Sequence, residues 1–463
     1  MHSLKWFENN CSFLYHSLHK KKLLRYSQTI LVVLTMCLFS CKSMQNIGQY
    51  SDQEVQNPYY SADRFEYIDK IYKNNIRTAL LHPVNEPIAY PILDINGRAQ
   101  LEISFDDLEG DVKNYSYNIV HCNADWTPSD ISPFDYIDGF TEDTFDDYRY
   151  AFNTLQEYTQ YRAFIPNNRL RFTQTGNYLL TVFEGNDPDD VVITKRFMIY
   201  EDKLSMNSSV LRPNISRYLP THQRLSFTIN YGNLSGVSPL TDFKVFVLQN
   251  GRWDNAIKNL IPQFIRDKEL VYDYTDQSLF RAGKEFRFFD FRDLEFSTQR
   301  VKKVWLEEEE NHLQIAIDEK RPKDRYSFWK DMNGQYYVGR FGGFTRVDAD
   351  YAWTHFKLVL DEPISTGNVY IFGALSNWKP QKRFQLHYDY EEKAYKTAIY
   401  LKQGVYNYQY VIWEDGSAEI NDQELEGNHW ETENSYLILV YYRPFNARFD
   451  QLIGIREVNS RQY

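Results

Sequence analysis

The chain has 463 residues, a net charge of −11 and an aromatic content of 17 %, with 37 Tyr and 31 Phe. That length allows roughly three domains of about 150 residues each, and aromatic side chains favour the half-buried surfaces of β-sheets. No basic stripe accompanies the negative charge, so the composition argues against a nucleic-acid partner.

Residues 1–40 have the pattern of an export signal. A basic run over 20–25 precedes the apolar stretch TILVVLTMCLFS (29–40). A bilayer-spanning helix needs about 20 apolar residues, so this shorter stretch is typical of a signal-peptide core. Residues 38–41 read LFSC, which resembles the bacterial lipobox. The resemblance implies cleavage before Cys41 and acylation of Cys41, giving a lipid anchor; an ordinary secretory signal is the alternative.

Behind this signal we expect a tether and a first β-sandwich. Residues 41–65 are polar and without period, which predicts a flexible tether. Several strand-like runs separated by turn residues follow over 66–202, and these predict the N-terminal sandwich. The Asn-Gly pair at 96–97 lies between two such runs and predicts a hairpin there.

The stretch HCNADW (121–126) is the part of the sequence that most resembles a catalytic cluster. On a strand, His121 and Cys122 point to opposite faces and cannot form a nucleophile–base pair. No second His or Cys lies nearby to complete a metal site. The acidic turn DDLEGD (106–111) lacks the ligand spacing of an EF-hand. We therefore predict a structural cluster, with no catalytic, metal or cofactor site.

Two more sandwiches are expected, over 203–345 and 346–463. Runs such as LSFTINYG (225–232) and DFKVFVLQNG (242–251) have the composition of strands. The run EEEE (307–310) is predicted to be a solvated strand end, because an unpatterned charge run is a weak signal for a metal site.

Three runs, at 101–140, 150–167 and 175–202, together resemble the first domain of the type IX secretion system plug proteins. The segment GKEFRFFDFRDLEF (283–296) is similar to the second domain of that family. The resemblance is collinear and extends over most of 70–460. It implies a periplasmic protein that closes the inner mouth of an outer-membrane β-barrel translocon when no cargo occupies it.

A second resemblance concerns the expected third domain. Residues 367–416 resemble the early-set immunoglobulin-like sandwich of glycogen-binding modules. That likeness implies that Trp378 could stack on a sugar and that Asn434 could contact it. After Asp415–Gly416, however, no Trp supplies the second stacking position. A fold alone does not imply a function, so a scaffold kept for protein contacts is the simpler interpretation.

Two hypotheses of different class follow: a translocon plug without chemistry, or a glycan-binding surface lipoprotein. No nucleophile elbow, zinc-protease motif or Walker loop indicates an enzyme. Lipoproteins exported to the surface of these bacteria resemble one another in having acidic residues behind the acylated cysteine, and CKSMQNIGQY (41–50) has none. We therefore expect tandem immunoglobulin-like β-sandwiches behind a lipoprotein signal, anchored on the periplasmic face of the outer membrane. The expected partners are the translocon barrel and outer-membrane lipid.

Overall fold

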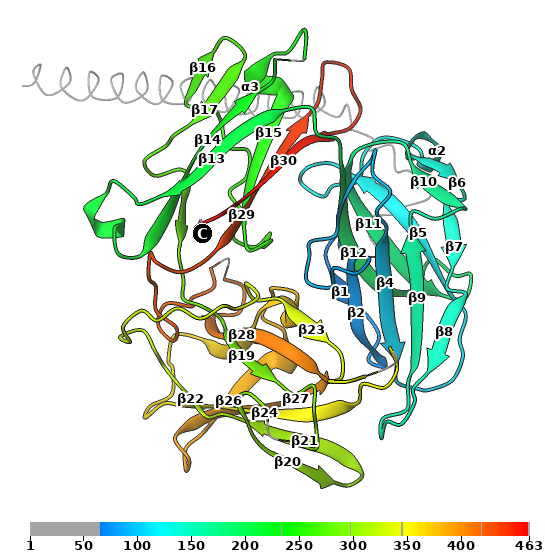
Figure 1. Cartoon of the computed structure of the whole chain (residues 1–463), viewed down its shortest axis with the longest axis vertical. Helices are drawn as coiled ribbons and strands as arrows, with labels where there is room; N and C mark the ends of the chain where they lie inside the picture. The colour runs from blue at the N-terminus through cyan, green and yellow to red at the C-terminus, as the bar shows by residue number, and fades with distance from the viewer. Residues whose placement is uncertain (1–64, 233, 297, 344–345, 418, 462–463) are drawn as a thin grey trace, which may run out of the picture. The chain divides into compact units, whose positions relative to one another are not determined.

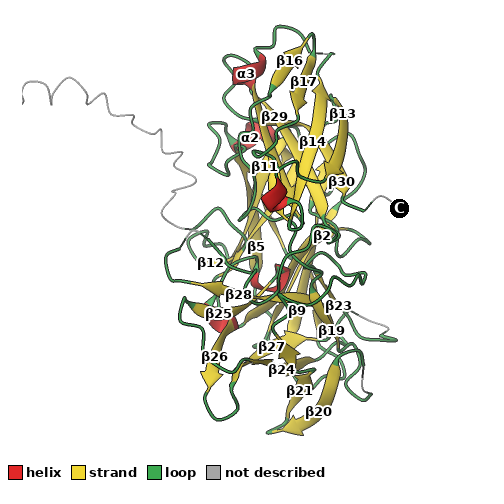
Figure 2. Ribbon diagram, turned by 90° about the vertical axis from the view of Figure 1, so that its left-hand side faces the viewer, coloured by secondary structure: helices red, strands yellow, loops and turns green. Residues whose placement is uncertain are grey.

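The computed structural model describes residues 65–463, except 233, 297, 344–345, 418 and 462–463. The expected signal peptide, the expected acylation site at Cys41 and nearly all of the expected tether lie outside these residues. Strands make up almost all of the regular structure (Figure 2), which confirms the all-β prediction. In this part of the chain, none of the helices has the length and apolar character that crossing a bilayer requires.

The first sandwich has two main sheets and a small third one. One sheet has the order β1 (Lys70–Ile71), β12 (Val191–Tyr200), β11 (Gly176–Glu184), β5 (Tyr115–Cys122) and β7 (Glu142–Thr144), with β3 (Ile92–Asp94) parallel to β12. The facing sheet has the order β2 (Ile76–Pro83), β4 (Leu101–Asp107), β9 (Thr159–Ile165) and β8 (Asp147–Tyr150). The short strands β6 (Ile137–Gly139) and β10 (Leu170–Phe172) pair beside the helix α2 (Pro133–Tyr136). Aliphatic and aromatic side chains together fill the core between the main sheets.

The hairpin expected at 96–97 is wrong. The turn itself forms, since Gly97 N donates to Asp94 O at 2.9 Å. The strands on its two sides belong to different sheets, because β3 pairs with β12 while β4 pairs with β2 and β9. An Asn-Gly turn reverses the chain, but here the returning strand crosses to the opposite layer of the sandwich.

The middle sandwich combines segments that are distant in the sequence (Figure 1). One sheet has the order β13 (Ser205–Leu211), β14 (His222–Asn230), β17 (Glu269–Tyr272) and β16 (Phe264–Arg266), with β18 (Leu279–Arg281) also paired to β14. The other has the order β15 (Phe243–Gln249), β29 (Ser435–Tyr442) and β30 (Gln451–Asn459). The short helices are α3 (Pro239–Asp242) and η1 (Ser216–Tyr218). Side chains from both sheets share one core.

The third sandwich is one ten-stranded sheet that folds over a single core. Its order is β19 (Arg287–Asp290), β28 (Gly404–Trp413), β25 (Asn368–Phe372), β26 (Gln385–Asp389), β27 (Ala394–Lys402), β24 (Tyr351–Val359), β21 (Glu310–Ile315) and β20 (Val301–Glu307). β22 (Asp318–Glu319) pairs with β24 and β23 (Tyr336–Val338) with β28; the 3-10 turns are η2 (Ala374–Ser376) and η3 (Lys382–Phe384). The acidic run 307–310 forms the exposed β20–β21 turn.

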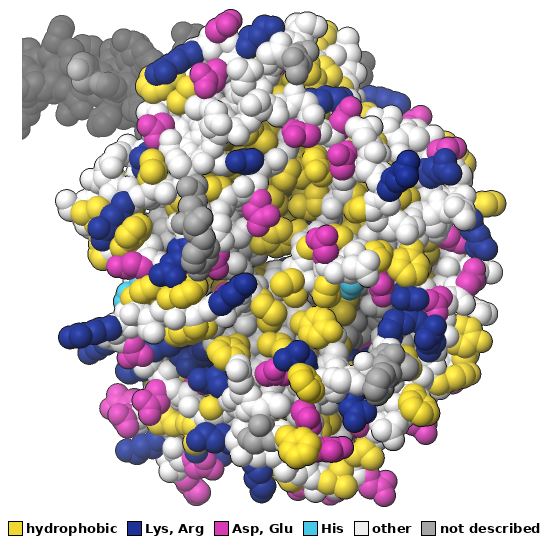
Figure 3. All heavy atoms as spheres, in the orientation of Figure 1, with side chains coloured by type: hydrophobic (Ala, Val, Ile, Leu, Met, Phe, Trp, Pro, Cys, Tyr) yellow, Lys and Arg dark blue, Asp and Glu magenta, His cyan; other side chains and the backbone are white. Residues whose placement is uncertain are grey.

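We expected a domain boundary between residues 345 and 346, but strands from each side of that boundary belong to the sandwich on the other side. β29 and β30 return from the C-terminal end to complete the middle sandwich, whereas β19 to β23 join the third. β29 is buried on both faces, so it needs cover on each face, and it pairs along its edges with β15 and β30. Residues 64–463 consequently form one compact unit, and hydrophobic side chains occupy much of the hollow where the sandwiches meet (Figure 3).

Candidate functional site

The stretch 121–126 is a packing cluster rather than a reactive one. His121 at the end of β5 is 1 % exposed, and its Nε2 donates to Thr175 O at 3.1 Å. Its Nδ1 lies 2.8 Å from the hydroxyl of Ser129. Burial disfavours the charged imidazolium and lowers the pKa of His121 to about 4. The ring is therefore held neutral, with both nitrogens occupied by the fold.

Cys122 is equally enclosed and points away from His121. Its side chain is fully buried, and its Sγ donates to Val120 O at 3.7 Å. Burial raises the pKa of the Cys122 thiol, which keeps the thiol protonated and poorly reactive. His121 and Cys122 thus have different hydrogen-bond partners, Ser129 and Thr175 for the imidazole and Val120 for the thiol.

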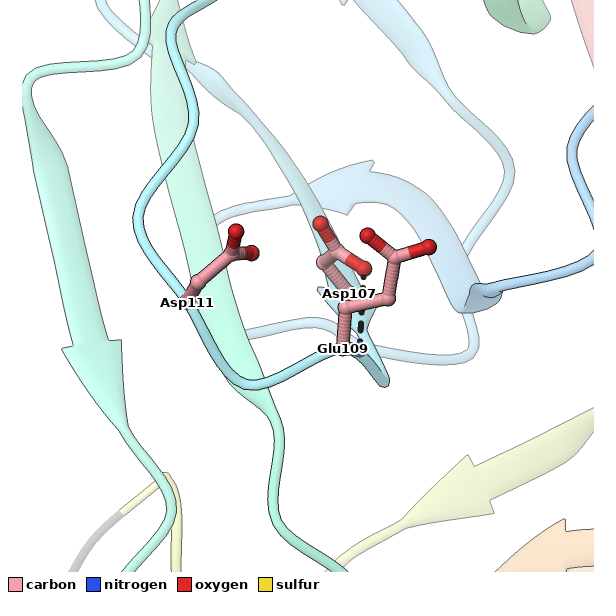
Figure 4. Close-up of side chains that lie close together, drawn as sticks. All are labelled: Asp107, Glu109 and Asp111. Atoms are coloured by element: carbon pink, nitrogen blue, oxygen red, sulfur yellow. Dashed lines mark hydrogen bonds between the residues drawn. The ribbon is translucent and has the colours of Figure 1, made fainter.

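The acidic turn after β4 carries its own cation. Carboxylate oxygens of Asp107, Glu109 and Asp111 lie within 4.8 Å of one another (Figure 4). The ammonium of Lys113 is 3.0 Å from Asp107 and 3.8 Å from Asp111, and it also contacts Glu109. Asp107 accepts further bonds from Asn75 and Tyr115. This lysine offsets one of the three negative charges and contacts all three carboxylates that a metal ion would need.

The structure places Trp378 and Asn434 in different sandwiches. Trp378 is half-buried, and its ring packs edge-on against Phe372 at 5.6 Å, with the guanidinium of Arg252 at 4.9 Å. Asn434 lies just before β29 in the middle sandwich and is only 3 % exposed. Its amide donates to Ala282 O at 2.9 Å and accepts from Asn250 at 2.8 Å. Both side chains thus have internal partners, and they do not form one open face.

Trp378 shares a cavity with two other tryptophans where the three sandwiches meet. The cavity has a volume of about 320 Å³ and is lined by Trp126, Trp253 and Trp378 together with aliphatic and basic side chains. Trp126 and Trp253 stack edge-to-face at 5.2 Å, and the guanidinium of Arg196 covers Trp126 at 4.3 Å. One face each of Trp126 and Trp378 is therefore covered by arginine, as is typical of a packed junction.

A buried ion pair joins the first and third sandwiches. Lys402 at the end of β27 donates to Asp106 on β4 at 2.6 Å, and the two side chains are 1 % and 0 % exposed. The hydroxyl of Tyr351 donates to the same carboxylate at 2.7 Å. The ammonium also lies 3.9 Å from the ring centre of Tyr158. Burial lowers the pKa of Lys402 against the opposing pull of Asp106.

A second buried carboxylate joins the first and middle sandwiches. Asp450, in the loop between β29 and β30, is fully buried and accepts from the backbone N–H of Ala124 at 3.0 Å. Lys244 and Arg443 pair with it at 2.9 Å each. Tyr441 adds a hydrogen bond to Asn177 of 2.7 Å across the same junction.

Sequence reasoning did not find these junction residues. The sequences around Asp106 and Lys402 are typical of β-strands. Neither sequence indicates that the two side chains, 296 residues apart, would form an ion pair. The sequence does contain one signal, which is a charged residue next to apolar positions of a strand. A charged side chain is rarely buried unless it is paired, so this pattern indicates a buried ion pair. That signal indicates a pair without identifying its second member.

Comparisons with known proteins show which family and which solved structures this chain resembles. Residues 76–201 match the family described as the type 9 secretion system plug protein 1st domain. A crystal structure of a hypothetical protein from Parabacteroides merdae is 34 % identical, with a TM-score of 0.82, and the match covers 85 % of this chain and 100 % of that one. A crystal structure of a collagen adhesin from S. aureus is 9 % identical over 83 % of this chain and 94 % of its own, with a TM-score of 0.11. No curated protein matches the chain.

Proposed function

The chain belongs to the type IX secretion system plug protein family, and from this premise we propose that it seals the translocon barrel of that system. In this proposal it is an outer-membrane lipoprotein on the periplasmic face, anchored through Cys41, that occupies the mouth of the barrel when cargo is absent. The family is a secretion plug family and not a family of enzymes.

The observation that carries the proposal is the locking of three sandwiches into one unit. Asp106–Lys402 is an ion pair between the first and third sandwiches with a fully buried carboxylate, and the buried carboxylate of Asp450 in the middle sandwich accepts a hydrogen bond from Ala124 N of the first. Separating the first and third sandwiches would leave the two charges of the Asp106–Lys402 pair unpaired at a high cost, and separating the first and middle sandwiches would break the hydrogen bond to Asp450, so both junctions resist opening. A body with fixed junctions loses little conformational entropy when it binds, and it obstructs a pore as a single obstacle.

The anchor supports the same role. A basic run, a short apolar core and LFSC precede Cys41 in the sequence. Acylation there would hold the protein at the membrane that contains the barrel and raise its effective concentration near the pore. No acidic residue occurs over 42–50, which favours the periplasmic leaflet for this anchor.

The glycan-binding alternative has less support. Trp378 packs against Phe372 and Arg252, and the amide of Asn434 is used by the surrounding backbone and side chains. A sugar stacks best on an open aromatic face, and these contacts occupy much of the surface that such stacking would need.

Affinity purification from detergent-solubilised outer membranes tests the proposal. The full-length protein carries a C-terminal tag, and mass spectrometry identifies the chains that purify with it. We expect the translocon barrel to be recovered in near-equal amount, and not to be recovered with a tagged unrelated lipoprotein from the same membranes. Recovery of glycans without any barrel would contradict the plug proposal and support the alternative.

A further inference from the structure

The edge strand β8 is unpaired on one side. It pairs with β9 in the register Asp147↔Arg162 to Tyr150↔Thr159, and no other described strand pairs with it. An edge strand of this kind presents backbone N–H and C=O groups to any extended chain that approaches it.

Two bonds just after β8 show which backbone groups point outward. Ala151 N donates to Tyr158 O at 2.7 Å, toward β9, whereas Phe152 N donates to Val347 O at 2.8 Å, away from the sheet. Because the direction alternates along a strand, the backbone groups of Tyr148 and Tyr150 also point away from β9. The bond to Val347 shows that this edge already accepts a hydrogen-bonded neighbour at one end.

The two faces of β8 differ in chemistry. Tyr148 and Tyr150 share one face and are 44 % and 58 % exposed, with their ring centres 6.3 Å apart. Tyr148 also lies 6.0 Å from the buried ring of Tyr161 and so extends the aromatic core to the surface. Arg149 lies on the opposite face, is exposed, and makes no ion pair with any described residue.

The arginine face of β8 borders a groove between the first and third sandwiches. The groove has a volume of about 540 Å³, and its charged lining consists of Arg149, Arg162, Arg340 and Arg346 against Glu102 and Asp348. Asp147 contacts Arg162 at 2.8 Å and Arg346 at 3.2 Å. Even so, Nη1 of Arg346 is buried without a hydrogen-bond partner among the described residues.

Positive charge therefore exceeds negative charge in this groove, although the whole chain carries −11. Figure 3 shows basic side chains gathered beside hydrophobic ones on the right of this face, where β8 and β9 lie in Figure 1. The exposed guanidinium of Arg149 is open to the groove, and a carboxylate of a ligand can form charge-assisted hydrogen bonds with it.

We propose that β8 binds an extended acidic polypeptide segment, which adds as a fifth strand to the sheet β2-β4-β9-β8. In such β-augmentation, the outward backbone groups of Tyr148 and Tyr150 supply main-chain bonds, and alternate side chains supply specificity. One side of the added strand faces the tyrosines and suits apolar residues; the other faces the arginines and suits Asp or Glu. The segment recognised is therefore one in which acidic and apolar side chains alternate.

The backbone edge favours a polypeptide over a simple anion. A phosphate or a lipid headgroup could use the arginines, but it cannot pair with alternating N–H and C=O groups or cover the tyrosine row. The binding site on β8 is inferred independently of the proposed function. Only the identification of the translocon barrel as the protein that presents the acidic segment rests on that function.

Fluorescence anisotropy with the purified full-length protein tests the site. The probe is the fluorescein-labelled peptide Glu-Val-Glu-Tyr-Glu-Val-Glu, compared with the same peptide carrying Lys in place of every Glu. We expect saturable binding of the acidic peptide only. Arg149→Glu should weaken binding about tenfold or more, because it replaces an attraction by a repulsion.

The backbone part of the site needs its own variant. Tyr150→Pro removes an outward N–H without removing a bond to β9, and proline is tolerated at such edge positions. It should also weaken binding about tenfold. Arg171→Glu changes an exposed arginine on β10, outside the groove; it is the matched control and should leave the affinity unchanged. A peptide N-methylated on the alternate amides that face β8 should not bind, and this test requires no change to the protein.

Three results would overturn the inference. They are no binding of the acidic peptide, equal binding by Arg149→Glu, or complete displacement by inorganic phosphate with N-methylation having no effect. The last result would mean that the groove is an anion site without strand addition. If the wild-type protein does not bind the acidic peptide while its strain keeps a sealed outer membrane, this inference is rejected and the plug role stays intact.

Discussion

Lys402 and Asp106 form a buried ion pair 2.6 Å long between the third and first sandwiches. Each charge would be expensive to bury alone, so the pair holds only while the two sandwiches stay in register. Tyr351 donates to the same carboxylate at 2.7 Å and thereby adds a neutral hydrogen bond to the pair. The rigidity on which the plug proposal depends is concentrated at this junction.

Lys402→Met should destabilise the protein by about 3–5 kcal/mol, because it leaves the Asp106 carboxylate buried without its cation. Asp106→Asn should also be destabilising, whereas the double variant should recover much of the loss. Urea unfolding of the four proteins measures the coupling between the two residues. Strictly additive losses would mean that the pair does not link the sandwiches energetically.

His121 predicts a loss of stability in mild acid. Its folded pKa is about 4 because of burial, while an unfolded histidine titrates near about 6.5. Between these values the unfolded state binds one more proton than the folded state, so stability is full above the unfolded pKa and falls as the pH decreases toward 4. The expected loss between about pH 7.5 and pH 5 is about 2 kcal/mol.

Replacing this histidine isolates its share of the acid sensitivity. In His121→Gln, urea midpoints should differ less between the two pH values than in the wild type, whatever the variant's stability at neutral pH. The exposed His387→Gln is the matched control and should keep the wild-type difference. An unchanged pH dependence in His121→Gln would show that other groups cause the sensitivity.

Cys122 should behave as a buried, protonated thiol. The folded protein should not react with Ellman's reagent on the timescale of minutes, and one thiol should become reactive on unfolding of the mature chain. Cys122→Ala should fold and retain the proposed sealing activity, since this buried side chain contributes packing and one weak hydrogen bond. Rapid modification in the native state would contradict the structural assignment.

Cys41 is predicted to be the lipid attachment site. Cys41→Ser should abolish acylation and release the protein from the membrane fraction into the soluble periplasm, measured by fractionation and intact-mass analysis. Cys122→Ala is the control, because it removes a cysteine from the folded part only. A Cys41→Ser protein that stays membrane-bound without an acyl mass would reject the anchor.

Strand content could be predicted from the sequence because it depends on local composition. The apolar, β-branched runs that form β11 and β12 are also strands in the structure. Pairing could not be predicted in the same way, because it depends on which distant strand covers a given edge. The Asn-Gly pair at 96–97 thus predicted a turn correctly but a hairpin wrongly, and residues 435–459 returned to complete a sandwich that begins near 205.

The candidate sugar residues show the same limit. Trp378 and Asn434 were both predicted from the similarity to glycogen-binding modules. That prediction assumed that residues 346–463 form a single domain. In the structure, β29 belongs to the middle sandwich, and Asn434, which directly precedes it, forms a hydrogen bond with Asn250 there. The junction residues were missed for a related reason, since a paired charge has no local signature of its partner.

The most direct test of the central claim is the permeability of the outer membrane to vancomycin, a molecule too large for ordinary porins. Deletion of the gene should sensitise cells to vancomycin, and removal of the translocon barrel as well should restore resistance, because the leak passes through the unsealed pore. Complementation with the wild-type gene should also restore resistance. A deletion strain that stays as impermeable as its parent, with the barrel present and assembled, would contradict the account.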